Sequence, residues 1–427
     1  MSVAPRHLPQ SLWAASATPA QATPPLQGEL ETDVAIVGAG FTGLSTALHL
    51  AELGIRACVL DAGEPGWGAS GRNGGQVIPG LKFDPEQLLA KFGEQGEYLC
   101  EVAGSAADEV FNLIQRHGID CDATRKGWIQ PAASPAALRG IEQRAEQWRR
   151  RGVPVELLDR EAVARRIGNE HYLGAWVDPR AGSVQPLSYV RGLVRAALAA
   201  GARVHGHSPV LSLQRQAGRW QLELACGARV RAEKVLLATN GYTDGLWPGL
   251  RRTLIAANSF IIATRPLSPE LAASVLPGGE VCSDARRLLL YFKRDAQGRL
   301  LLGGRGPFSE PSGDGDWSHL QRSLAQLYPQ LAGVPIEYRW SGRVALTQDF
   351  LPHLHEPAPG LSTLLGYNGR GVAMATTLGR HMALRLAGRG ERFPLPPAPL
   401  KPIPLHGLQR LYLGAAIAWY RCLDALF

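Results

Sequence analysis

Residues 33–50 read Asp33-Val-Ala-Ile-Val-Gly-Ala-Gly-Phe-Thr-Gly-Leu-Ser-Thr-Ala-Leu-His-Leu50. The apolar run at the start predicts a buried strand, the spacing G-x-G-x-x-G predicts a tight turn, and the apolar residues that follow are spaced as in a helix. In such a unit Gly38 permits the turn, Gly40 lets the backbone approach a pyrophosphate, and Gly43 lets the helix pack closely on the strand. This stretch therefore predicts a strand, turn and helix that hold phosphates at the helix N-terminus.

An acidic residue follows the next predicted strand. This strand is Ala57–Leu60, and the residue after it is Asp61. In units of this kind an acid at the strand end binds the ribose hydroxyls of an adenosine. Together with the glycine turn, Asp61 predicts a site for an adenine dinucleotide.

The composition limits the class of protein and its partners. The chain has 427 residues, enough for two domains, and its net charge of +8 is carried mainly by arginines spread along the sequence. No basic stripe is interleaved with aromatic residues, which argues against nucleic-acid binding. The six cysteines include no C-x-x-C pair, which argues for reduced thiols in a cytoplasmic protein and against a disulfide framework or a metal site.

The two ends of the chain have compositions of their own. Residues 1–28 are rich in proline, alanine and serine and lack the apolar core of a signal peptide, so they predict an extended N-terminal arm. Residues 400–427 predict a C-terminal helix, whose apolar stretch Leu411–Tyr420 is too short to cross a bilayer. We expect this helix to pack on the protein, with a peripheral membrane contact as the alternative.

Two further glycine-rich segments lie far from the first turn. Residues 66–76 combine glycines with the polar side chains Ser70, Arg72, Asn73 and Gln76, as in a loop wrapped on a flat polar ring or a phosphate. Residues 366–374 form a third glycine turn, which opens a helix and supplies a second helix N-terminus. Nicotinamide dehydrogenases usually have one such element, whereas an FAD site that holds its cofactor along the whole length uses all three.

Four motifs make the chain resemble a known family. They are Val37-Gly-Ala-Gly-Phe-Thr-Gly-Leu-Ser-Thr-Ala-Leu-His-Leu-Ala51, Gly68-Ala-Ser-Gly-Arg-Asn-Gly-Gly-Gln76, Trp340-Ser-Gly-Arg-Val-Ala-Leu-Thr347 and Gly366-Tyr-Asn-Gly-Arg-Gly371. From about Trp13 to the C-terminus the sequence resembles the D-amino-acid-oxidase-like (DAO) superfamily of FAD-dependent amine oxidoreductases. It most resembles the bacterial branch that contains γ-glutamylputrescine oxidase and pipecolate oxidase-like proteins.

The resemblance implies a fold and a division into domains. We expect an α/β fold (α+β overall), with a Rossmann-like FAD-binding domain built from discontinuous segments and an antiparallel β-sheet substrate domain. The FAD-binding domain would comprise residues 29–90, 150–250 and 340–390, and the substrate domain residues 91–149 and 251–339. The order of elements agrees, because residues 259–264, 288–293 and 300–304 read as antiparallel strands with a helix at 318–327 against them.

The resemblance also implies which residues hold FAD. The glycine turn and Asp61 would bind the ADP half, residues 70–76 would cover the ribityl chain and the flavin ring, the backbone of Val210 would hold the adenine edge, and residues 369–372 would direct N–H groups at the flavin pyrimidine. The full set is Gly38, Gly40, Phe41, Thr42, Gly43, Asp61, Ala62, Ala69, Ser70, Gly71, Arg72, Asn73, Gly74, Gly75, Gln76, Val210, Asn240, Gly241, Gly342, Gly369, Arg370, Gly371 and Val372. Relatives with covalent FAD carry a cysteine or histidine near these turns. Residues 62–80 contain neither, so noncovalent FAD is expected.

The implied reaction is hydride transfer from the carbon beside an amine nitrogen to flavin N5, giving an imine that hydrolyses. The substrate would be a primary or secondary amine, either a γ-glutamyl-polyamine or a cyclic imino acid such as L-pipecolate. The electrons would pass to O2, giving H2O2. The alternatives are a quinone-linked amine dehydrogenase and an FAD hydroxylase that uses NAD(P)H, although the second nucleotide motif expected for a hydroxylase is absent.

The candidates for catalytic side chains are Tyr291, Arg343, Lys293 and Tyr367. The two tyrosines and Trp340 would bound the substrate pocket, and Lys293 or Lys82 would be the lysine that activates oxygen in relatives. Sarcosine oxidase-like members bind the substrate carboxylate with a lysine after the third glycine motif, where this chain has Ala373. The arginines that remain for a carboxylate are Arg72, Arg305, Arg343 and Arg370.

Overall fold

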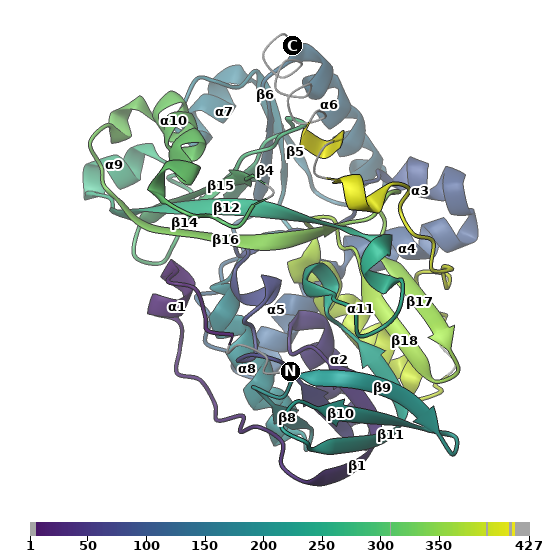
Figure 1. The fold of residues 1–427 in the computed structure, drawn as a ribbon. Helices are drawn as coiled ribbons and strands as arrows, with labels where there is room; N and C mark the ends of the chain where they lie inside the picture. The colour runs from purple at the N-terminus through teal and green to yellow at the C-terminus, as the bar shows by residue number, and fades with distance from the viewer. Residues whose placement is uncertain (1–5, 308, 390–391, 410–411, 415–427) are drawn as a thin grey trace.

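The first of two large sheets is mainly parallel (Figure 1). The computed structural model describes residues 6–307, 309–389, 392–409 and 412–414. The strands, in spatial order, are β17 (His353–Ala358), β18 (Leu361–Leu365), β11 (Arg229–Leu237), β1 (Glu29–Val37), β2 (Ala57–Leu60) and β8 (Arg203–His205). All neighbours in this row are parallel except β17 and β18. A hairpin of β9 (Val210–Gln216) and β10 (Arg219–Leu224) pairs with the first part of β11.

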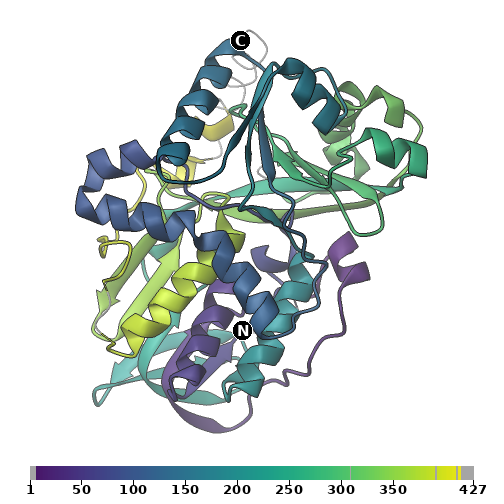
Figure 2. The ribbon, with the colours of Figure 1, turned by 180° about the vertical axis from the view of Figure 1, so that it is seen from behind.

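The second half of β1, residues 34–37, is buried on both faces, which explains its unbroken apolar sequence. Val34 and Ile36 pack into the core beneath the helices, whereas Ala35 and Val37 pack into a separate core on the opposite face. Three helices lie side by side on the helical face in Figure 2: α2 (Phe41–Glu52), α8 (Pro186–Ala199) and α11 (Gly371–Leu386). The carboxyl ends of the parallel strands are thus brought next to the N-termini of α2 and α11.

The second sheet is mainly antiparallel and forms the upper part of Figure 1. Its order is β16 (Ile336–Leu346), β12 (Ile255–Pro266), β15 (Arg299–Arg305), β14 (Tyr291–Arg294), β13 (Val281–Ser283), β4 (Trp128–Ala132), β6 (Gly174–Asp178) and β5 (Glu156–Leu158). Only β13 and β4 are parallel neighbours. The associated helices are α6 (Pro135–Arg150), α7 (Arg160–Ile167), α9 (Pro269–Ser274) and α10 (Ser318–Leu327). Leu320, Leu324 and Leu327 bury one face of α10, as their helical spacing predicts.

The predicted fold class is confirmed, but the domain boundaries drawn from the sequence differ from the two sheets. Residues 150–178, which we assigned to the FAD-binding domain, contribute β5 and β6 to the second sheet. Helix α5 (Ala106–Arg116), which we assigned to the substrate domain, packs on α11, and Thr377 donates a hydrogen bond to the Ala106 carbonyl. Local patterns did not predict these placements because a strand or helix finds its partner through tertiary packing.

Five further helices and strands lie outside the two large sheets. They are α1 (Leu12–Ser16), β3 (Gln76–Val77), α3 (Pro85–Phe92), α4 (Glu94–Gly104) and β7 (Gly182–Ser183), the last of which pairs with β3. The arm predicted to be extended therefore contains a short helix, and Leu12 and Trp13 on it are buried. Trp13 meets Trp340 edge to face, so packing on β16 orders this segment.

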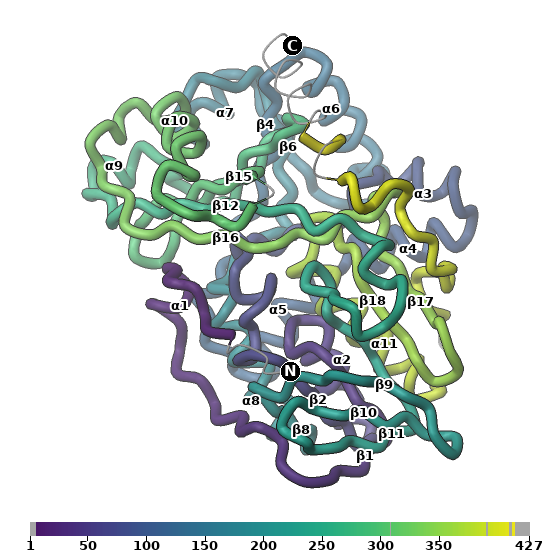
Figure 3. Tube along the Cα trace, in the orientation of Figure 1, coloured from purple at the N-terminus to yellow at the C-terminus, as the bar shows by residue number. Residues whose placement is uncertain are grey.

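After α11 the chain runs back along the edge strand β17 (Figure 3). The Ala398 N–H donates to the Leu354 carbonyl at 2.7 Å. Most of the predicted C-terminal helix, from residue 415 onward, lies outside the described residues. Within the ranges that the structure describes, no helix is both long and apolar enough to span a bilayer.

Candidate functional site

The glycine turn after β1 has the geometry that its spacing predicts. Gly38 has φ of +112°, a conformation that favours glycine, and a Cβ there would lie 2.8 Å from the Ala238 carbonyl oxygen. A Cβ on Gly43 would overlap the Gly38 carbonyl oxygen, and one on Gly40 would lie 2.8 Å from Ser70 Oγ. Glycine at these three positions therefore lets the turn, helix α2 and the loop at Ser70 pack closely on one another.

Asp61 ends β2 and closes the same turn. Its carboxylate accepts hydrogen bonds from the N–H groups of Ala39 at 2.7 Å and Gly63 at 2.9 Å. Burial raises the pKa of Asp61, and these two hydrogen bonds oppose that rise. The carboxylate oxygens keep further lone pairs, so Asp61 can also accept hydrogen bonds from ribose hydroxyls.

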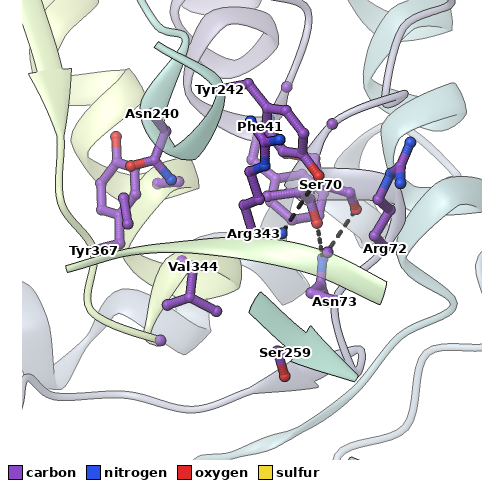
Figure 4. Close-up of a pocket in the computed structure, with 18 of the residues that line it drawn as sticks. Phe41, Ser70, Arg72, Asn73, Asn240, Tyr242, Ser259, Arg343, Val344 and Tyr367 are labelled. Atoms are coloured by element: carbon purple, nitrogen blue, oxygen red, sulfur yellow. Dashed lines mark hydrogen bonds between the residues drawn. The ribbon is translucent and has the colours of Figure 1, made fainter. Parts of the chain in front are cut away.

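The loop 66–76 is held over the turn by its own polar side chains (Figure 4). Ser70 Oγ accepts from the Phe41 N–H at 3.0 Å, and the Asn73 side chain donates to the carbonyl oxygens of Ala69 and Ser70. The Arg72 guanidinium lies 4.7 Å from the centre of the Trp67 ring, and its Nε donates to the Trp67 carbonyl. Arg72 thus orders this loop, although the sequence had also made it a candidate for a substrate carboxylate.

The third glycine turn meets the first one. The Tyr367 hydroxyl lies 2.6 Å from Thr42 Oγ1, and Asn240 Oδ1 accepts from the Gly366 N–H at 2.9 Å. In Figure 4 Tyr367 and Asn240 lie together, across the site from Arg72. The N-termini of α2 and α11 and the loop 66–76 therefore converge on one place, as three glycine-rich elements of one FAD site would.

One cavity of about 540 Å³ runs between the two sheets at this place. Of the residues predicted from the sequence, those that line it are Gly38, Gly40, Phe41, Thr42, Asp61, Ala62, Ala69, Ser70, Arg72, Asn73, Gly74, Gln76, Val210, Asn240, Tyr291, Gly342, Arg343, Tyr367, Gly369, Arg370, Gly371 and Val372. Five others lie behind the wall: Gly43, Gly71, Gly75, Gly241 and Lys293. The four glycines pack against backbone atoms, so they shape the wall rather than face the cavity.

The four candidates for catalysis occupy different environments. Tyr291 and Tyr367 face the cavity with their hydroxyls held by Ser259 at 2.8 Å and by Thr42, and burial raises the pKa of both. Lys293 is buried behind Gly75 and donates to the Val184 carbonyl at 3.1 Å. Arg343 stands at the rim, where it pairs with the exposed Glu310 at 2.7 Å.

Several wall residues were not among the predicted site residues. From the first sheet and its loops come Trp67 and Tyr242, and from the second come Trp128, Gln130, Asn258, Asp284 and Arg287. Trp67 and Tyr242 each stand next to a predicted glycine element, so their position in the sequence was a usable signal. Trp128 and Gln130 carry no such signal, because only the pairing of β4 with β13 and β6 brings them to the cavity.

The residues present fit an FAD molecule. An elongated ligand with an anionic centre suits a cavity with two helix N-termini, a strand-end carboxylate and glycine backbone that added side chains would obstruct. The chain would hold the ADP half at Gly38, Gly40 and Asp61, and the flavin between residues 70–76 and 369–372.

Comparisons with known proteins agree with this assignment. The family model described as FAD dependent oxidoreductase (DAO) matches residues 33–385. The chain is 33% identical to γ-glutamylputrescine oxidoreductase of Escherichia coli over 386 residues, which is 90% of each chain. It is also 33% identical to a probable oxidoreductase, OrdL, of Haemophilus influenzae over 377 residues, 86% of each. Among solved structures, glycine oxidase of Geobacillus kaustophilus superposes with a TM-score of 0.71 at 23% identity, over 85% of this chain and 96% of that one.

These matches confirm the predicted family, the prediction that the protein is an enzyme, and FAD as its cofactor. The fold of the solved neighbour agrees with the two-sheet arrangement. The chain belongs to the DAO family of FAD-dependent oxidoreductases.

Proposed function

We propose that this enzyme oxidises a primary or secondary amine to an imine, with a γ-glutamyl-polyamine as the leading substrate. The reaction removes two electrons and two protons from a CH–NH group, water then hydrolyses the imine, and O2 takes the electrons to give H2O2. The observation that carries the proposal is the cavity between the two sheets, in which the glycine turn and a wall of aromatic and cationic side chains face one another. The relative with a γ-glutamylated substrate in its name supports the choice of substrate.

The bound FAD supplies the electron-accepting chemistry, and the protein supplies position and surroundings. The N-terminus of α11 presents unpaired N–H groups, which stabilise negative charge that develops beside them. Tyr291 and Tyr367 wall the cavity with rings whose hydroxyls are already bound, so they orient a substrate by shape. An amine must be neutral to release a hydride, and the cationic side chains of the cavity wall favour that form.

Both the substrate and the electron acceptor have alternatives that must be tested. A cyclic imino acid such as L-pipecolate carries the same CH–NH group and is the second candidate substrate. Lys82 lines the cavity and Lys293 lies behind it, so Lys82 is the better placed to assist O2, whereas transfer to a quinone would make the enzyme a dehydrogenase. An FAD hydroxylase would instead be reduced by NAD(P)H.

The test is anaerobic reduction of the purified, yellow protein. We expect γ-glutamylputrescine or L-pipecolate to abolish the flavin absorption band, and air to restore it with formation of H2O2. Reduction by NADPH but by no amine would favour the hydroxylase. Reduction by an amine without reoxidation by air, but with reoxidation by a quinone, would favour the dehydrogenase. A protein that releases no FAD on denaturation would overturn the proposal.

A further inference from the structure

Two cationic side chains line the cavity that Trp128 and Gln130 of β4 also line. The Arg370 guanidinium lies 4.6 Å from the centre of the Trp128 ring, and Lys82, in the segment after β3, lines the same cavity. The Nε atom of Arg370 is buried without a hydrogen-bond partner. In the part of the chain that the structure describes, no hydrogen bond or ion pair engages the Lys82 ammonium. We call Lys82 and Arg370 the β4 cations.

The carboxylates around the β4 cations are already engaged. Asp84 pairs with Arg144, Asp178 with Arg180, and Asp284 with Arg286. Arg144 also donates to Gln130 on β4, which places the ion pair of Asp84 and Arg144 against the same wall. Charges set in a protein wall without a counter-ion cost free energy, which a bound anion would recover.

The free-energy cost of holding these charges corresponds to a lowered pKa at both β4 cations. The Lys82 side chain is accessible, as expected at the wall of an open cavity. Even so, the surrounding protein, together with the charges of Arg370 and Arg144, lowers the pKa of Lys82 to about 8. Burial, with a contribution from Arg144, likewise lowers the pKa of Arg370 to about 10. An anion bound between them would favour the charged form of both groups.

We propose that Lys82 and Arg370 together bind a carboxylate of the substrate. Arg370 offers paired N–H donors beside the Trp128 ring, and Lys82 adds an ammonium, a combination suited to a carboxylate. The inference rests on the proposed function and narrows it, because an amine that also carries a carboxylate fits this wall. An unmodified diamine would bring its second ammonium against two cations and is expected to bind poorly.

The test uses binding rather than turnover, on the FAD-loaded protein. Two carboxylates that contain no amine serve as probes. N-butylglutaramate keeps the carbon chain and the carboxylate of γ-glutamylputrescine without its two amines, and cyclohexanecarboxylate has the ring of pipecolate without its nitrogen. Their neutral counterparts are N-butylbutanamide and cyclohexanecarboxamide. We expect the wild type to bind a carboxylate probe more tightly than its neutral counterpart, as measured by the change in the flavin spectrum.

Lys82→Gln should weaken carboxylate binding about 10-fold or more and leave binding of the neutral probes unchanged. Lys82→Arg should retain most of the affinity, and Lys91→Gln, an exposed lysine on α3, should have no effect. FAD content should be the same in all variants. Unchanged carboxylate binding in Lys82→Gln, or neutral probes that bind as well as carboxylates, would overturn the inference.

The two proposals fail separately. If a carboxylate-bearing amine reduces the flavin but Lys82→Gln leaves its KM and probe affinity unchanged, the proposed function stands and the β4 cations have another role. If no amine reduces the flavin, the proposed function fails, whereas the binding measurement still decides whether a carboxylate occupies this wall. Slower reoxidation by O2 in Lys82→Gln, with unchanged probe affinity, would assign Lys82 to oxygen and overturn the inference.

Discussion

The two sides of the cavity are built in opposite ways. The turn side, with Gly38, Gly40 and Asp61, comes from one short stretch of chain, and backbone geometry prescribes its residues. The β4 side, with Lys82 and Arg370, comes from segments that are far apart in the sequence and that the tertiary fold brings to one cavity. Because the two sides come from different segments, a side chain such as Lys82 can change without disturbing the turn.

The strongest test of the turn side is Gly43→Val. The new Cβ would overlap the Gly38 carbonyl oxygen and crowd Ile36, and backbone atoms cannot move aside cheaply. We expect a loss of at least about 2 kcal/mol of stability and of most bound FAD. Thermal unfolding and the ratio of flavin to protein absorbance would measure both. Gly140→Ala, on the exposed face of α6 with no atom near the new Cβ, should instead stabilise by about 0.5–1 kcal/mol.

The same contrast explains what could be predicted from the sequence. The strand, turn and helix at residues 29–52 were predictable because glycine is required where φ is positive or a helix packs on backbone, and α10 was predictable from its leucine spacing. The burial of Trp13 and the pairing of β5 and β6 with the second sheet depend on distant segments. Trp128 reached the cavity in the same way, so no local pattern marked it.

Asp61→Ala tests the turn side without adding bulk. It removes the acceptor for the Ala39 and Gly63 N–H groups and the expected acceptor for the ribose. Hydrogen bonds to charged groups are each worth about 1.5–3 kcal/mol, so FAD affinity should fall about 10- to 100-fold. Titration of the apoprotein with FAD would measure this. The control is Asp108→Ala, whose carboxylate pairs with Arg125 at the surface, and FAD affinity there should be unchanged. Equal affinity in the Asp61 and Asp108 variants would remove Asp61 from the site.

Lys293 lies behind the cavity wall, and Lys293→Met tests whether its buried charge lowers the stability of the protein. Burial lowers the pKa of Lys293 to about 8, so between about pH 8 and its ordinary value of 10.5 the unfolded chain holds a proton that the folded protein has released. Stability of the wild type therefore rises with pH over this window, because the buried charge is lost. We expect the Lys293→Met protein to be more stable than the wild type at pH 7 by about 1–3 kcal/mol, reduced by the loss of the hydrogen bond to the Val184 carbonyl. We also expect that its stability does not rise with pH over this window. Denaturant unfolding of both proteins at pH 7 and pH 10 would measure the difference, and an equal pH dependence would contradict the assignment.

The smallest effect is expected at the rim of the cavity. Arg343 resembles the β4 cations in charge but pairs with the exposed Glu310, and its guanidinium lies 5.2 Å from the centre of the Tyr242 ring. An exposed pair of this kind contributes about 0–1 kcal/mol, so Arg343→Gln should change carboxylate-probe affinity by less than about 5-fold. Probe titration beside Lys82→Gln gives the comparison directly. If Arg343→Gln weakened carboxylate binding as much as Lys82→Gln, the cation that selects the substrate would lie at the entrance of the cavity. The proposed division between a cofactor-binding turn and a substrate-selecting β4 side would then be wrong.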